Sequence, residues 1–237
     1  MEQMSIPNEA LKYILFQRTA YLWFHRTWAY RVLKKIIPFS FYNWEVAIEA
    51  KLSPARVKAL YENDMRQEYA SIKDFLPETC SSIMDIGCGV AGIDVFLNKH
   101  YQGLAPKFNL LDKTQTEPAV FYKFKTRAAF YNSLAVAKTM LMSNNIPENR
   151  VNLIEATDNN DININSSVDL IISLISWGFH YPVETYLDRA YEVLNEGGTL
   201  IIDVRKGTNG LDLIKNKFGK VDIIGSGEKY QRILARK

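Results

Sequence analysis

An apolar run that ends in a glycine-rich turn is the feature of this sequence that most constrains its fold. Residues 83–92 read Ile-Met-Asp-Ile-Gly-Cys-Gly-Val-Ala-Gly. Ser82–Ile86 predicts a buried strand, and the glycines after it, Gly87 and Gly89, allow a tight turn and a close approach of the backbone to a ligand. A helix is expected to begin at Gly92, where free N–H groups suit a polar ligand group. This arrangement is typical of nucleoside binding.

The glycine spacing alone fits more than one nucleoside. Gly87-x-Gly89-x-x-Gly92 also matches the dinucleotide fingerprint, and Asp112 lies where an acid would bind a ribose. A nicotinamide enzyme and an ordinary glycine-rich turn are therefore alternatives. Asp85 decides between the ligands, because a carboxylate beside the turn repels a pyrophosphate but accepts a hydrogen bond from an ammonium group.

From residue 81 onward, the sequence alternates between strands and helices, which predicts a parallel sheet with crossover helices. Helices are expected at about 92–97, 130–144, 183–194 and 210–217. A turn at 195–198 and a terminal hairpin around 225–228 complete the pattern. The expected strands are 82–86, 107–111, 151–156, 168–174, 199–204, 220–224 and 229–236.

The acid-x-Gly-x-Gly sequence of Asp85, Gly87 and Gly89 resembles the first motif of the class I S-adenosylmethionine-dependent methyltransferases, and the resemblance covers Ser81–Lys237. The terminal hairpin agrees with it. The resemblance implies an α/β fold, with a Rossmann-like doubly wound sheet, a C-terminal antiparallel hairpin and an N-terminal helical extension. It divides the chain into a helical lid or extension, 1–77, and an S-adenosylmethionine-binding domain, 78–237.

The resemblance also implies a set of cofactor contacts. Asp112 would accept hydrogen bonds from both ribose hydroxyls, since each carboxylate oxygen can take one. Thr157 and Asp158, after the third expected strand, are the candidates for the adenine end. The full set of expected cofactor residues is Asp85, Gly87, Cys88, Gly89, Asp112, Thr157, Asp158 and Ser173.

The methyl acceptor is expected beside the segment after the fourth strand, Ser173–Pro182, because ligands lie at the carboxyl ends of parallel strands. An exposed aromatic loop there would line a pocket. His180 is the candidate general base, with a loop-shaping role as its alternative. The expected acceptor contacts are Tyr131, Asn132, Trp177, Phe179 and Tyr181.

One long helix or two short ones are also predicted over 8–37, and further helices at 44–50 and 54–75, before the glycine-rich turn. Between Ala10 and Trp44 the chain has basic and aromatic residues but no acid. This stretch predicts a lid over the acceptor, a peripheral contact with an acidic membrane, or a grip on an anionic substrate or nucleic acid. Glu68 and Tyr69 are expected to close over the cofactor. The basic residues are Lys12, Arg18, Arg26, Arg31, Lys34 and Lys35.

Composition limits the remaining possibilities. With 237 residues, 47% of them hydrophobic, the chain can bury one sizeable core. A net charge of +3 is too small to predict nucleic-acid binding by the whole protein. The two cysteines and the absence of Cys/His spacing predict neither a disulfide framework nor a metal site. Because no leader or membrane span is recognised, a soluble cytoplasmic protein is expected.

The sequence as a whole therefore predicts a methyltransferase that acts on a small molecule, with a metabolite or sugar hydroxyl as the preferred acceptor. A small amine is the alternative acceptor. A non-catalytic nucleoside-binding module is the alternative from another class. A nucleic-acid methyltransferase is disfavoured, because Ser176-Trp177-Gly178-Phe179 stands where an Asn-Pro-Pro-aromatic or Asp-Pro-Pro-aromatic sequence would be expected.

Overall fold

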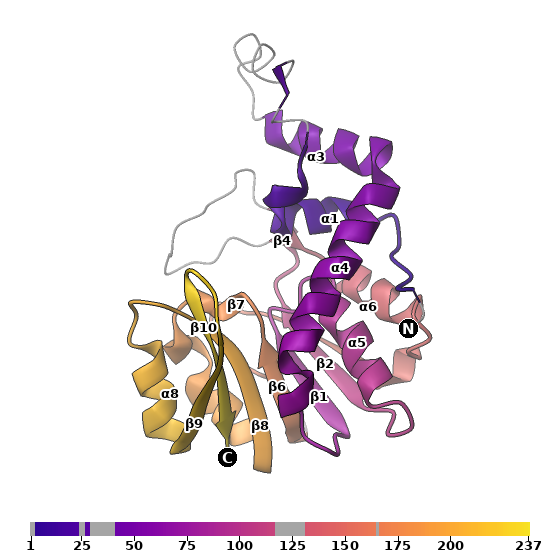
Figure 1. Ribbon diagram of the computed structural model, residues 1–237. Coiled ribbons are helices and arrows are strands. Elements are labelled where there is room, and N and C mark those ends of the chain that lie inside the picture. The colour runs from indigo at the N-terminus through magenta and orange to yellow at the C-terminus, as the bar shows by residue number, and fades with distance from the viewer. Residues whose placement is uncertain (1–2, 24–26, 29–40, 117–130, 165) are drawn as a thin grey trace.

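The protein is built around one seven-stranded sheet with helices on both faces (Figure 1). The computed structural model describes residues 3–23, 27–28, 41–116, 131–164 and 166–237. The strand order is β5-β2-β1-β6-β8-β10-β9. The strands are β1 Ser82–Ile86, β2 Lys107–Asp112, β5 Val151–Glu155, β6 Val168–Ser173, β8 Leu194–Arg205, β9 Lys220–Ser226 and β10 Tyr230–Arg236.

The sheet confirms the predicted fold. Strands β5, β2, β1, β6 and β8 are parallel, and β10 lies antiparallel between β8 and β9. Strand β2, the next strand of this sheet along the chain, lies on one side of β1, and β6 lies on the other side. The carboxyl ends of β1 and β6 therefore form the point where the winding reverses, which is the usual ligand crevice of such a sheet. The glycine-rich turn lies at this crevice.

Two hydrophobic clusters cover the two faces of the sheet. On one face pack α1 Ala10–Gln17, α4 Pro54–Ile72, α5 Gly92–His100 and α6 Leu134–Met142. On the other lie α7 Leu187–Val193 and α8 Gly210–Phe218. Helix α3, Phe41–Leu52, projects beyond the sheet at the top of Figure 1.

The N-terminal helices share the first of these cores rather than forming their own. Leu11 and Ile14 of α1 and Val57 of α4 are buried in the same cluster as Ile83 of β1. Of the one long or two short helices expected over 8–37, the structure describes α1 and a 3-10 turn at Thr19–Tyr21, and 24–26 and 29–40 lie outside the described residues. The expected helix 54–75 is α4 followed by a 3-10 turn, Lys73–Phe75. The division of the chain at residue 77 stays a prediction.

The aromatic segment after β6 is a strand, not the exposed loop expected from the sequence. Strand β7, Ser176–Tyr181, lies beside β8. The reason is Trp177, whose side chain is fully buried and whose indole N–H donates to the carbonyl of Val183 at 2.9 Å. Burying this large side chain holds the segment against the second core.

Two further element boundaries differ from the expectation. The turn predicted at 195–198 is absorbed into β8 as an irregularity in its pairing with β6, so β8 begins at Leu194. The helix predicted from residue 130 begins at Leu134 instead. Before it, β4 Tyr131–Asn132 pairs with β3 Gln115–Thr116 in a separate two-stranded sheet. This pairing fixes Asn132 close to the end of β2.

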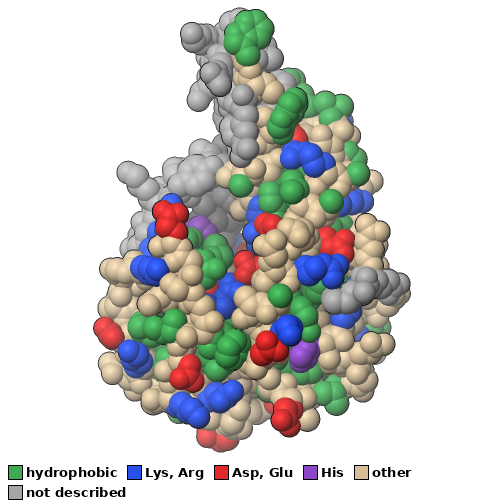
Figure 2. Space-filling view, in the orientation of Figure 1, with side chains coloured by type: hydrophobic (Ala, Val, Ile, Leu, Met, Phe, Trp, Pro, Cys, Tyr) green, Lys and Arg blue, Asp and Glu red, His purple; other side chains and the backbone are tan. Residues whose placement is uncertain are grey.

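The surface face in Figure 2 carries acidic and basic side chains interspersed, without a broad field of one sign. Among the described residues of this face, no extended basic track for a nucleic-acid backbone is seen. In the part of the chain that the structure describes, no helix is long and apolar enough to cross a membrane.

A buried ion pair joins the C-terminal hairpin to the rest of the sheet. The Arg232 guanidinium on β10 donates to both carboxylate oxygens of Asp203 on β8, at 2.7 and 2.8 Å. It also donates to Glu68 at 2.7 Å and to the hydroxyl of Ser71, both on α4. Asp203 accepts a further hydrogen bond from the N–H of Ile175, between β6 and β7. Four segments therefore depend on one guanidinium.

We expect Arg232→Met to lower the free energy of unfolding by about 3–5 kcal/mol, because it leaves the buried Asp203 carboxylate uncompensated. Chemical denaturation followed by circular dichroism measures the loss. Arg236→Met, at the exposed end of the same strand, is the matched control and should cost little. A loss for Arg232→Met no larger than that of the control would contradict the structural role of the pair.

Candidate functional site

The turn after β1 has a backbone that side chains would obstruct. Gly87, Gly89 and Ala91 have φ angles of 78°, 55° and 59°, in the left-handed region. A Cβ on Gly87 would overlap the hydroxyl of Ser176, so glycine is required there for space as well as conformation. The Gly87 N–H donates to the carbonyl of Leu111 at 2.7 Å, which anchors the turn to β2. The result is a backbone cradle at the carboxyl end of β1.

Two carboxyl groups lie buried beneath this cradle. Asp85, on β1, is 4% exposed, and Asp94, in the first turn of α5, is 0% exposed. The groups are close enough to act on each other, although their oxygens do not meet hydrogen-bond geometry. Burial raises the pKa of Asp94 to about 7, and burial together with the Asp94 carboxyl raises the pKa of Asp85. A positive charge placed here would relieve both groups.

Asp112 reaches the same cradle from the end of β2. Its carboxylate accepts hydrogen bonds from the N–H of Gly89 at 2.8 Å and from its neighbour Lys113 at 2.7 Å. Burial raises the pKa of Asp112 to about 6, although these N–H donors act to lower it. Asp85 and Asp112 therefore both lie at this turn, and their roles in cofactor binding stay predictions.

Asn132 joins this cluster, near Asp112 and Cys88. Its amide nitrogen lies 4.0 Å from the sulfur of Cys88, and its side chain acts on the Asp112 carboxyl. Burial, followed by the charge of Asp112, raises the pKa of the Cys88 thiol, so the thiol stays protonated. Asn132 was predicted to contact the acceptor, but the structure places it beside the expected ribose acid. The side chain of the other predicted residue, Tyr131, lies outside the described part.

Unpartnered buried polar atoms gather around the turn. Among the described residues, three buried side-chain oxygens lack a hydrogen-bond partner: both carboxylate oxygens of Asp94 and the amide oxygen of Asn132. Such atoms are costly in a folded protein and are explained where a ligand satisfies them. Polar groups from outside the chain, a ligand or ordered water, would satisfy these oxygens.

The N-terminal helices cover the turn directly. A Cβ on Gly89 would lie 2.8 Å from the amide oxygen of Gln17, at the end of α1. A Cβ on Gly92 would overlap the hydroxyl of Tyr61, on α4. The sequence indicated Glu68 and Tyr69 as the covering residues, which was wrong, because Glu68 pairs with Arg232 and Tyr69 bonds His100. Neither Gln17 nor Tyr61 stands in a motif that would have revealed it.

Tyr181, one of the predicted acceptor contacts, lies beside Gly87 at the crevice. Its hydroxyl lies 3.8 Å from the Cβ position of Gly87, and it shares a hydrogen bond with Ser176. Burial, followed by the neighbouring Tyr186, raises the pKa of Tyr181 well above its ordinary value, so this hydroxyl stays protonated. Tyr186 stacks edge-on against Tyr181, with ring centroids 6.1 Å apart. The sequence missed Ser176 and Tyr186, because each needed the course of β7 to be known.

Two predicted site residues have structural roles instead. Trp177 was expected to line the acceptor pocket, but its full burial in the second core removes it from any surface that an acceptor reaches. Ser173 was expected to contact the cofactor. Its hydroxyl donates to the carbonyl of Ile86 at 2.7 Å and accepts from the N–H of Trp177 at 3.0 Å. It thus ties the end of β1 to the start of β7.

His180 and Phe179 lie farther along β7. His180 is exposed, and its ring packs edge-on against Phe179 with centroids 4.9 Å apart. The Arg205 guanidinium stacks over the Phe179 ring at 4.7 Å. Desolvation by the surrounding protein, together with the charge of Arg205, lowers the pKa of His180. The imidazole is therefore neutral at pH 7 and able to accept a proton.

The residues predicted at the adenine end lie in solvent. Asp158 is 99% exposed and pairs with Lys113 at 3.5 Å. Thr157 is exposed as well. Glu155, at the end of β5, accepts two hydrogen bonds from Thr114, at 2.6 and 2.9 Å. Asp158 therefore points into solvent, and its role in cofactor binding remains a prediction.

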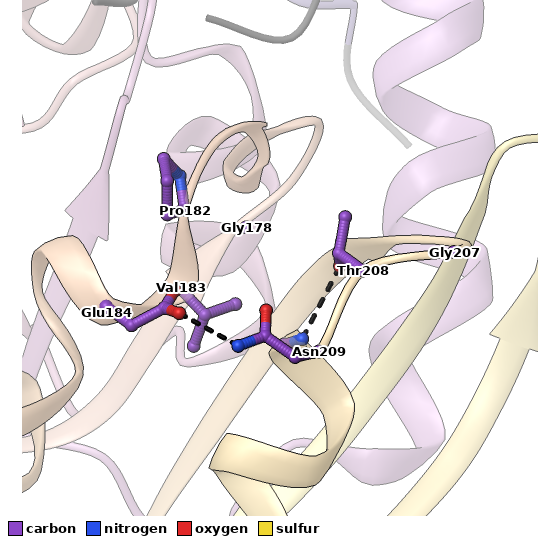
Figure 3. Close-up of a pocket in the computed structure, with 8 residues that line it drawn as sticks. Gly178, Pro182, Val183, Glu184, Gly207, Thr208 and Asn209 are labelled. Carbon is purple, nitrogen blue, oxygen red and sulfur yellow. Dashed lines mark hydrogen bonds between the residues drawn. The ribbon is translucent and has the colours of Figure 1, made fainter. Parts of the chain in front are cut away.

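A separate pocket of about 370 Å³ opens between the ends of β7 and β8 (Figure 3). Its polar groups satisfy one another: the amide of Asn209 donates to Glu184 at 3.0 Å, and the N–H of Gly210 donates to Thr208 at 3.4 Å. None of the buried side-chain atoms without a hydrogen-bond partner belongs to these lining residues, so this pocket lacks the unpartnered oxygens found at the glycine turn. Within the described ranges, no group of three His, Cys, Asp or Glu side chains could hold a metal ion.

Comparison of the sequence with family models and with curated proteins gives no match. Solved structures do match. The StiE O-MT, residues 961-1257, is 14% identical with a TM-score of 0.53, over 78% of this chain and 61% of that one. A methyltransferase from Pyrococcus furiosus is 18% identical, with a TM-score of 0.49, over 72% and 81%.

A T. Thermophilus 16S rRNA methyltransferase, in complex with AdoMet and Guanosine, is 13% identical with a TM-score of 0.47, and the match covers 66% of this chain and 37% of that protein. The chain thus spans less than two thirds of the length of the rRNA enzyme and of the StiE chain. At these identities the similarity establishes the fold and leaves the activity to the site. With its strand order and its StiE match, the chain has the fold of the class I methyltransferases.

Proposed function

We propose that this protein is an S-adenosylmethionine-dependent methyltransferase that acts on a small-molecule acceptor. The cofactor would supply a methyl group already activated by its sulfonium. The chain's own residues would then bind and align donor and acceptor and exclude water, because an in-line transfer asks for little more. The two free cysteines, both buried, fit a cytoplasmic protein.

The observation that carries this proposal is the set of unpartnered oxygens around the turn. Asp94, beside Asp85, presents a buried negative site that fits the α-ammonium and sulfonium of S-adenosylmethionine. Asn132 and Asp112 present acceptors and a donor that fit ribose hydroxyls. A pyrophosphate would face three carboxyl groups at this turn, which disfavours NAD.

The cover over the turn supports a small acceptor. Gln17 and Tyr61 lie directly over Gly89 and Gly92, so a bulky polymer has little room to approach from that side. Proteins of similar fold include, by their names, an rRNA methyltransferase and an O-MT, and these names do not decide which acceptor this chain uses. A hydroxyl acceptor would need a base, and His180 is proposed for it. An amine acceptor would need only a neutral nitrogen beside Tyr181.

The first prediction concerns the ligand. The purified chain should bind S-adenosylmethionine and S-adenosylhomocysteine but not NAD, and Asp112→Ala should weaken binding by about 1–3 kcal/mol, since ribose hydroxyls lose a buried acceptor. Isothermal titration calorimetry measures all three ligands. Asp222→Ala, at an exposed position on β9, is the control. Tight NAD binding without a response to the adenosyl ligands would overturn the assignment.

The second prediction concerns pH. Burial raises the pKa of Asp94 from its ordinary 3.8 to about 7, so ionising this carboxyl destabilises the ligand-free fold. The penalty is absent below the ordinary pKa, grows as pH rises, and is complete above about 7. Asp94→Asn should therefore raise the melting temperature strongly at pH 7.5 and much less at pH 4, while weakening S-adenosylmethionine binding. Thermal unfolding at both pH values, with Asp222→Asn as control, tests this. An equal effect at both values would contradict the buried charge.

The third prediction separates chemistry from binding. With a hydroxyl acceptor found by screening for release of S-adenosylhomocysteine, His180→Ala should lower turnover by about 10²–10⁴-fold and leave cofactor affinity nearly intact. His100→Ala, on α5 beside Tyr69, is the matched control. Full activity of His180→Ala on a hydroxyl acceptor would exclude the base role. With an amine acceptor, the pH dependence should persist in the variant, because it belongs to the substrate nitrogen.

A further inference from the structure

Arg18 lies where the N-terminal helix meets the glycine turn. It follows Gln17, whose amide oxygen is 2.8 Å from the Cβ position of Gly89. One guanidinium nitrogen of Arg18 donates to Asp64 of α4 at 3.1 Å. Within the described residues this is its one ion pair, so most of its five N–H donors are available. The side chain is 31% exposed, which leaves it accessible to a ligand.

Tyr61 shows that this guanidinium shares the site with the carboxyl pair. Its hydroxyl covers Gly92, at the start of α5. Burial raises the pKa of Tyr61, the charge of Arg18 lowers it, and Asp94 and Asp85 raise it. One hydroxyl is thus within electrostatic reach of a cation on α1 and of two carboxyl groups below the turn. Charges of both signs surround the place where the ligand's tail would lie.

This arrangement is complementary to an α-amino acid. An ammonium suits the buried Asp85 and Asp94 pair, but a carboxylate on the same carbon would be repelled by that pair unless a cation faced it. Arg18 is a residue able to supply this charge, and its planar fork suits a carboxylate.

We propose that Arg18 binds the α-carboxylate of the cofactor's amino-acid end, which makes helix α1 part of the cofactor site as well as a cover over it. The inference rests on the proposed function, since it concerns the tail of S-adenosylmethionine. It assigns to one of the basic N-terminal residues a role in ligand choice: a ligand that lacks the carboxylate gains nothing from Arg18.

The test compares two ligands that differ by that one group, S-adenosylmethionine and decarboxylated S-adenosylmethionine, by isothermal titration calorimetry. Arg18→Gln should weaken S-adenosylmethionine binding by about 10–100-fold, the usual range for a charge-assisted hydrogen bond. Its affinity for the decarboxylated ligand should be unchanged or improved, because that ligand has only positive charges on its tail. Lys12→Gln, an exposed lysine on the same helix, should change neither affinity.

Asp64→Asn distinguishes ligand binding from a structural role. If Arg18 only holds α1 against α4, Asp64→Asn should reproduce Arg18→Gln, and both ligands should lose affinity equally; this result would overturn the proposal. If Arg18 binds the carboxylate, Asp64→Asn should retain or strengthen S-adenosylmethionine binding. If the native chain binds neither adenosyl ligand, the proposed function itself fails. If the native chain binds both ligands with equal affinity, the proposed function stands and the role of Arg18 is overturned.

Discussion

The structure depends on the ion pair between Arg232 and Asp203. Arg232 is 2% exposed and Asp203 is 0% exposed, so neither charge could remain buried without the other. The pair holds β10 beside β8, and through Glu68 and Ser71 it fixes α4 over the sheet. The same Asp203 carboxylate accepts the N–H of Ile175, whose φ of 52° is unusual for a β-branched residue.

That contact carries the effect of the ion pair into the site. Ile175 directly precedes Ser176, which lies against Gly87. It also follows the end of β6, where the hydroxyl of Ser173 donates to the carbonyl of Ile86. The strained backbone of Ile175 is stable because Asp203 over-determines it. The position of Tyr181 at the crevice therefore depends on a guanidinium in the last strand of the chain. Helix α4 and the acceptor side of the site are fixed by one network.

Much of the fold, and the place of two acids at the glycine turn, could be predicted from the sequence, because both rest on local patterns. Ser82–Ile86 is a strand with the predicted bounds, and Asp85 and Asp112 meet at the turn as their places after apolar strands required. Asp94 was not predicted, because an acid in the first turn of a helix is common and its burial depends on packing from α4.

The course of β7 and the cover over the turn could not be predicted, because they depend on tertiary contacts. An aromatic run reads the same whether its side chains line a pocket or fill a core, and Trp177 fills a core. Likewise, Gln17 and Tyr61 reach the turn from helices with no motif. Arg26, Arg31, Lys34 and Lys35 lie outside the described residues, so the membrane and anionic-ligand interpretations of that stretch stay predictions.

The cover over the glycine turn is anchored by helices α1 and α4. Helix α4 is held by the Arg232 network, and α1 buries Leu11 and Ile14 in the first core, so moving either helix would expose apolar surface. Gln17, by contrast, is exposed, and the atom nearest to Gly89 is the far end of its flexible side chain. The cover over Gly89 is therefore the end of one side chain, and it is carried by a helix that the first core holds in place.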